Sequence, residues 1–125
     1  MHIYWISPYI HIIGGLAESM KLAGLKAEYF FYDTLTNAIE NKTEEAEIIM
    51  IDLANYYDNL PWTIKQIKNN FGKDCKIICI SGASQLRSVL LVDYPEIKHI
   101  PLTDYFLLIK EQIEETIKTI DNNGN

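Results

Sequence analysis

Apolar and polar residues alternate along the chain in a pattern that predicts strands separated by helices. Five short runs are apolar and rich in β-branched or aromatic residues, which is typical of strands in a sheet covered on both faces. Between these runs, apolar residues recur every three or four positions, which indicates helices with one buried side. The predicted strands span residues 2–6, 27–33, 47–52, 76–81 and 97–100. The predicted helices span residues 9–23, 35–42, 61–70 and 84–92, with a last helix from about 104 to 120.

Five strand–helix alternations predict an α/β fold: a doubly wound, five-stranded parallel sheet with helices on both faces. We expect a single domain over residues 1–120, with a disordered tail at 121–125 and a loop at 53–60. The functional crevice of such a sheet lies beyond the carboxyl ends of its strands. Those ends carry Ser7-Pro8, Asp33, Asp52, Ser81-Gly82 and Ile100-Pro101.

The composition of the chain limits the kinds of molecule that it is expected to bind. The chain has 125 residues, 48% of them hydrophobic, and a net charge of −6, so it has too few cations to grip a phosphate backbone. We therefore expect no nucleic-acid partner. No apolar run is long enough to span a bilayer, and no basic leader precedes one, so we expect no membrane association. Cys75 and Cys79 lie in an apolar run without other metal ligands nearby, which indicates buried free thiols and a cytoplasmic location.

The residues at the predicted strand ends resemble those of the response-regulator receiver domain, over nearly the whole chain. Asp52 ends the third strand, Ser81 followed by Gly82 ends the fourth, and Pro101 follows the fifth. The resemblance implies a flavodoxin-like strand order of 2-1-3-4-5. It also implies that Asp52 occupies the phosphoacceptor position and Ser81 the switch-hydroxyl position.

The chain departs from that family in its charged residues. Receivers carry two acidic residues after the first strand that help to hold Mg²⁺, and a lysine before the proline after the fifth strand. Here those positions are Ser7-Pro8 and Ile100, and the aromatic switch position is Ile97. A hard divalent cation requires several oxygen ligands, so we expect no metal site, no cofactor and no catalytic residue. The chain is similar to a degenerate member, a pseudo-receiver: a non-enzymatic signalling or scaffold module that binds an unidentified protein.

Several residues at this edge have two interpretations. Asp52 is either a residual phosphoacceptor or a carboxylate that caps the following turn. Ser81 is a switch hydroxyl or a turn residue, and Asp33 either lies in the crevice or has a loop or helix-cap role. His11 is either a pH-sensitive contact or an ordinary surface residue.

The aromatic residues after Asp52 also have two interpretations. Tyr56, Tyr57 and Trp62 form an exposed interaction patch, or they fold back and cover the crevice. The charged face of the last helix, residues 110–118, is either solvated or part of an interface. The resemblance implies a homodimer through the fourth helix, fifth strand and last helix.

Two other functions stay open. One is a working but atypical receiver that is phosphorylated on Asp52. The other is a flavodoxin-like domain that binds a small ligand, or an enzyme, because a fold does not dictate function. No Gly-rich phosphate loop follows the first strand, which weighs against the second alternative.

Overall fold

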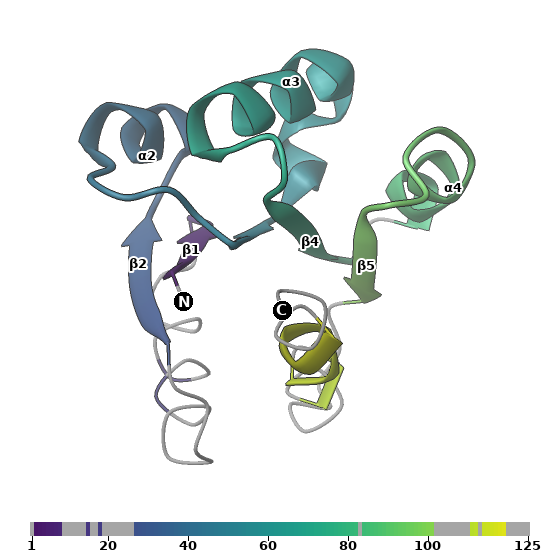
Figure 1. The fold of residues 1–125 in the computed structure, drawn as a ribbon. Helices are drawn as coiled ribbons and strands as arrows, with labels where there is room; N and C mark the ends of the chain where they lie inside the picture. Colours follow the sequence, from purple (N-terminus) through teal and green to yellow (C-terminus); the bar gives the residue numbers. More distant parts are fainter. Residues whose placement is uncertain are drawn as a thin grey trace.

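A parallel β-sheet of five strands forms the centre of the computed structural model, which describes residues 2–8, 15, 18, 27–82, 84–101, 111–112 and 114–119. Its order is β2-β1-β3-β4-β5, and every pairing is parallel. This flavodoxin-like topology confirms the predicted fold class and strand order (Figure 1). The strands are β1 (His2–Ile6), β2 (Glu28–Tyr32), β3 (Ile48–Ile51), β4 (Lys76–Ser81) and β5 (Lys98–Pro101).

The described helices occur where the apolar spacing predicts them. They are α2 (Leu35–Asn41), α3 (Leu60–Phe71) and α4 (Ser84–Asp93). Residues 111–112 and 114–119 are also helical, in agreement with the predicted last helix. The predicted helix 9–23 lies outside the described residues except at positions 15 and 18, which are helical. The tail at 121–125 also lies outside them.

The prediction of a loop at 53–60 is wrong. Leu53–Asn59 forms a 3-10 helix, η1, and α3 begins directly after it at Leu60. Two features, one of packing and one of the local backbone, explain the helical path. Leu53 is fully buried and anchors the start of η1, and Pro61 in the first turn of α3 has a backbone angle suited to that position.

Side chains of the central strands alternate between two buried layers, as a period of two requires. Figure 1 shows α2 and α3 on one side of the sheet and the helical residues near the C-terminus on the other. Toward α2, α3 and α4, the core includes Tyr4, Ile6, Ile49, Ile51, Ile77, Cys79, Leu86 and Leu90. The opposite layer includes Ile3, Trp5, Ile48, Met50, Ile78, Ile100 and Ile117. Both faces are apolar, which explains why the strands read as continuous apolar runs.

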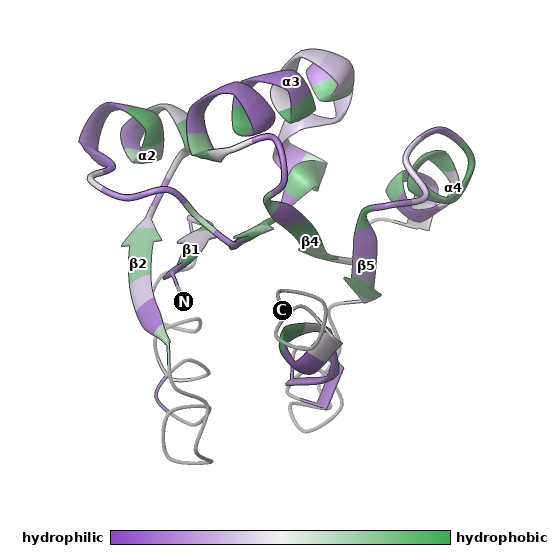
Figure 2. Cartoon of the chain, viewed as in Figure 1, coloured by the Kyte–Doolittle hydropathy of each residue, from purple (hydrophilic) through white to green (hydrophobic). Residues whose placement is uncertain are grey.

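The helices on the first face are amphipathic. Figure 2 shows green, hydrophobic residues of α2 and α3 alternating with purple, hydrophilic ones. In α3 the buried residues are Leu60, Thr63, Ile64, Ile67 and Phe71. The only polar residue among them, Thr63, is satisfied because its hydroxyl donates to the Asn59 carbonyl at 2.9 Å. No helix in the described part of the chain is long and apolar enough to cross a membrane.

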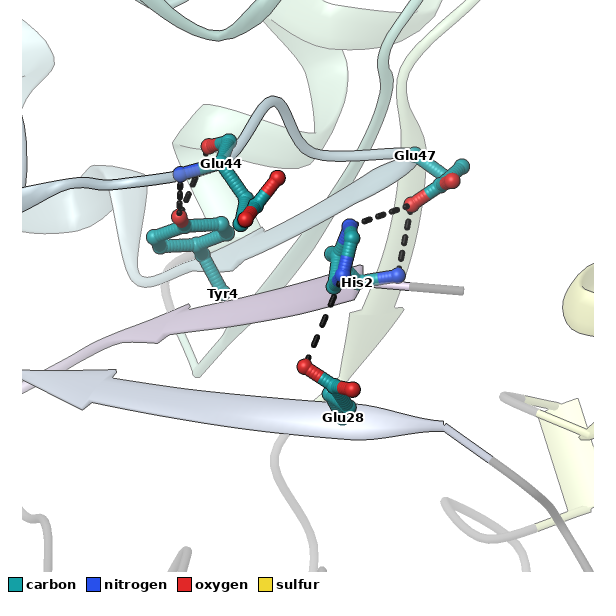
Figure 3. Close-up of polar contacts among 5 residues, drawn as sticks. All are labelled: His2, Tyr4, Glu28, Glu44 and Glu47. Carbon is teal, nitrogen blue, oxygen red and sulfur yellow. Dashed lines mark hydrogen bonds and ion pairs between the residues drawn. The ribbon is translucent and has the colours of Figure 1, made fainter.

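Polar contacts fix the amino-terminal edge of the sheet (Figure 3). The His2 amide donates to the Glu47 carboxylate at 2.6 Å, and the His2 ring lies 3.5 Å from the Glu28 carboxylate. The Tyr4 hydroxyl donates to the Glu44 carbonyl at 2.7 Å, and burial raises the pKa of this phenol. These contacts join β1 to β2 and to the segment before β3, at the edge opposite the expected crevice.

Two adjacent leucines test the placement of α4. Leu90 is 1% exposed and Leu91 is 67% exposed. We expect Leu90→Ala to lower the free energy of unfolding by about 2–5 kcal/mol, because it leaves a cavity in the core. Leu91→Ala should change it by less than about 0.5 kcal/mol. Urea unfolding of both variants measures the difference, and equal losses would contradict the described orientation of α4.

Candidate functional site

The carboxyl ends of the strands meet at one edge of the sheet, as the sequence predicts. The register pairs Ile6 with Ile51, Ile51 with Cys79 and Ser81 with Pro101. Asp52 therefore follows the central strand directly, with β1 on one side of it and β4 on the other. This edge is the candidate site.

Asp52 is the N-cap of η1. Its carboxylate accepts a hydrogen bond from the Ala54 amide at 3.0 Å, and its own amide donates to the Ile6 carbonyl at 3.4 Å. The side chain is half-buried. A carboxylate at this position satisfies one of the amides that a helix start leaves without an internal partner. The structure thus contains the hydrogen bond that the capping interpretation of Asp52 predicts.

The positions where receivers carry charge hold no charge here. Ser7 is buried and its amide donates to the Tyr32 carbonyl at 3.0 Å, whereas Pro8 is exposed. Ile100 is fully buried in the layer that contains Trp5 and Ile117. Within the described residues, no group of three or more His, Cys, Asp or Glu side chains could hold a metal ion.

Cys79 is a buried free thiol, as predicted, but the sequence alone did not place it or His99 at this edge. Cys79 of β4 and His99 of β5 are paired in register. Both nitrogens of the His99 ring are buried, and neither makes a hydrogen bond of good geometry to a described residue, although the Ser81 backbone interacts with the ring and raises its pKa. The alternation of side chains along a strand could have shown that both residues point to the same face of the sheet. Ile78 and Ile100 belong to the opposite layer, so their neighbours Cys79 and His99 face away from that layer. Only the strand register brings the two together.

Charges around this pair come from Asp52 and Arg87. Burial lowers the pKa of His99, the nearby Arg87 guanidinium lowers it further, and the Asp52 carboxylate opposes both. Burial raises the pKa of the Cys79 thiol to about 12, and the Asp52 charge adds to that shift. At neutral pH the thiol is therefore protonated and unsuited to nucleophilic attack. The edge below Asp52 is thus lined by a neutral imidazole and a thiol.

The other predicted residues occupy separate places. Ser81 is buried at the end of β4, beside Pro101. The Asp33 carboxylate accepts from the Asn37 side chain at 2.9 Å, next to Thr34, which caps α2. Thr34, not Asp33, is therefore the cap of α2, and Asp33 is a loop residue whose side chain contacts the first turn of the helix. His11 lies outside the described residues.

The aromatic residues divide between the two interpretations. The Tyr56 hydroxyl accepts from the Leu35 amide at 3.1 Å, so Tyr56 folds back onto the start of α2 and packs on the core. Tyr57 and Trp62 are 45% and 58% exposed. Tyr56 is therefore structural, whereas Tyr57 and Trp62 present aromatic surface to solvent.

On the last helix, the described charged side chains face outward to different degrees. Glu111, Glu115 and Lys118 are exposed and Glu114 is half-buried, while Ile117 faces the core. Lys110 lies outside the described residues. The solvated alternative therefore fits three of these side chains.

Comparison of the sequence with protein-family models, curated proteins and solved structures found no match. The likeness to receivers thus consists of the strand order and the residues at the strand ends.

The half-buried imidazole of His99 makes stability depend on pH. Because its pKa is lowered in the folded state, the unfolded chain binds a proton first as the pH falls. The stability that the neutral ring provides is complete above about pH 6.5, the ordinary histidine value, and is lost between that pH and the lowered pKa of the folded state. We expect His99→Phe to flatten this part of the curve of unfolding free energy against pH.

An NMR titration of the wild-type His99 ring checks the sign directly. Its midpoint should fall below that of a histidine in the urea-unfolded chain. A midpoint above that value would contradict the burial described here.

Proposed function

We propose that this chain is a receiver-like module that acts by binding another protein, without phosphorylation of Asp52. The observation that carries the proposal is the state of Asp52. Its carboxylate caps η1 through the Ala54 amide, and the neighbouring end of β1 supplies Ser7 and Pro8 in place of metal-binding carboxylates.

Phosphoryl transfer depends on positioning and on neutralisation of the charge that develops on the phosphoryl oxygens. A receiver supplies that neutralisation through a metal ion and a lysine. Here the lysine position is Ile100, whose side chain is buried in the core. Arg87, whose charge acts on His99 at this edge, is an exposed residue of α4. These features together support very slow transfer to Asp52.

Exposed aromatic and apolar side chains support the binding role. Tyr57 and Trp62 extend from η1 and α3, and Leu91 and Val92 from α4, with exposed fractions between 45% and 78%. Large side chains of this kind are common anchors in protein interfaces. Leu91 and Val92 lie on the helix that the resemblance implies in a homodimer, so we propose that self-association, where it occurs, uses α4.

The proposal is tested by incubation with acetyl phosphate and Mg²⁺, followed by intact-mass measurement. We expect no phosphorylated species, because no metal ligands accompany Asp52. A receiver domain that retains its acidic pair and lysine is the positive control.

Two matched variants locate any adduct that forms. Asp52→Asn removes the phosphoacceptor position, and Asp33→Asn removes an exposed carboxylate at the same edge. Efficient phosphorylation that Asp52→Asn abolishes and Asp33→Asn preserves would overturn the proposal and establish an atypical working receiver.

A further inference from the structure

The outward side of α3 differs from the rest of the chain in charge. α3 contains Lys65 and Lys68 and no acidic residue. The chain as a whole carries −6, so the residues outside α3 together carry −8. At physiological salt, charges interact over about 8 Å, so an approaching molecule senses the two lysines of α3, together with the exposed Asp58 of η1, more than the distant acids.

The same side presents an aromatic anchor. Helical spacing places Trp62, Lys65 and Asn69 on one face, and all three are exposed. The opposite face of α3, with Ile64 and Ile67, is buried against the sheet. Tyr57, 45% exposed, precedes this face in η1. We call these four residues the α3 outer face.

Lys65 and Lys68 differ in their contacts. The Lys68 ammonium donates to the carbonyls of Lys73 and Cys75, at 3.4 and 3.2 Å, which holds its charge at the end of α3. Lys65 is exposed, and in the part of the chain that the structure describes no carboxylate pairs with it. Lys65 is thus a cation ready to pair with a partner, one helical turn from Trp62.

We propose that the α3 outer face is the docking surface for an acidic segment of a partner protein, which places carboxylates near Lys65 and an apolar pocket around Trp62. This inference rests on the proposed function, since it names the partner chemistry of that binding role. Charge complementarity favours an acidic occupant here because the rest of the chain would repel one. A nucleic acid fits less well, since two lysines neutralise too few phosphates.

The chain contains a built-in reporter for this surface. Its two tryptophans are Trp5, which is 2% exposed, and Trp62, which is 58% exposed. Quenching of fluorescence by acrylamide therefore acts mainly on Trp62. Occupation of the α3 outer face should protect Trp62 and shift its emission to shorter wavelength.

The test uses the full chain and a displayed library of random short peptides. We expect the enriched peptides to be acidic with an apolar residue, and to protect Trp62 from acrylamide. Trp62→Ala should weaken their binding by about 10-fold or more, the effect of an interface hot spot. Lys65→Glu should weaken it and remove most of its dependence on salt.

Lys76→Glu is the matched control for Lys65→Glu, since it reverses the charge of another exposed lysine, at the start of β4. It should leave peptide binding unchanged. Because Trp62, Lys65 and Lys76 are all exposed, these variants should fold as the wild type does, which circular dichroism checks.

Three results would overturn the inference: no enriched peptide, enriched peptides whose binding Lys76→Glu weakens as much as Lys65→Glu does, or protection of Trp62 by a single-stranded oligonucleotide and by no acidic peptide. Phosphorylation is measured separately by mass. Acidic peptides that bind at Trp62 of a chain that is also phosphorylated would uphold the docking surface and reject only the proposed function.

Discussion

The hydrogen bond from the Ala54 amide to the Asp52 carboxylate determines how the chain leaves its central strand. It begins η1, and η1 places Tyr56 against the Leu35 amide before it continues into α3. The exposed position of Trp62 depends on that path, since Trp62 lies in the first turn of α3. The position of Asp52 at the end of the central strand suggests a catalytic or phosphoacceptor carboxylate. In the structure this carboxylate caps η1 instead.

The two edges of the sheet differ in how their polar groups are satisfied. At the amino-terminal edge, His2 and Tyr4 contact glutamates or their backbone, and these contacts join neighbouring strands. At the carboxyl edge, the Asp52 carboxylate accepts from a backbone amide, and His99 and Cys79 lie below it with shifted pKa values. Burial favours the neutral forms of both side chains. A neutral imidazole and a protonated thiol carry no positive charge that could neutralise a phosphoryl group.

Most of the fold could be predicted from the sequence because the apolar runs are long and separated by helical spacing. The strand at 76–81 was predicted with both its ends, and the strand order followed from the receiver likeness. The segment 53–60 was predicted wrongly because its polar and aromatic composition is typical of loops. Its helical path comes from burial of Leu53 and from the contact between Tyr56 and Leu35, which are tertiary effects.

The candidate site was predicted less completely. The position of Asp52 at the central strand end follows from sequence, and its cap role was one of two stated alternatives. The closeness of His99 and Cys79 was missed because it depends on the register of β4 and β5. Composition also could not separate Tyr56 from Tyr57, since neighbouring residues of one helix face opposite environments.

The central claim is that the Asp52 carboxylate accepts a hydrogen bond from the Ala54 amide and does not bind a metal ion. The most direct measurement is an NMR titration with Mg²⁺ that follows the backbone amide of Ala54, with Asp52→Asn as reference. The account predicts that this resonance stays in place at millimolar Mg²⁺ in both proteins. A saturable shift of the Ala54 amide in the wild type, absent from Asp52→Asn, would contradict it.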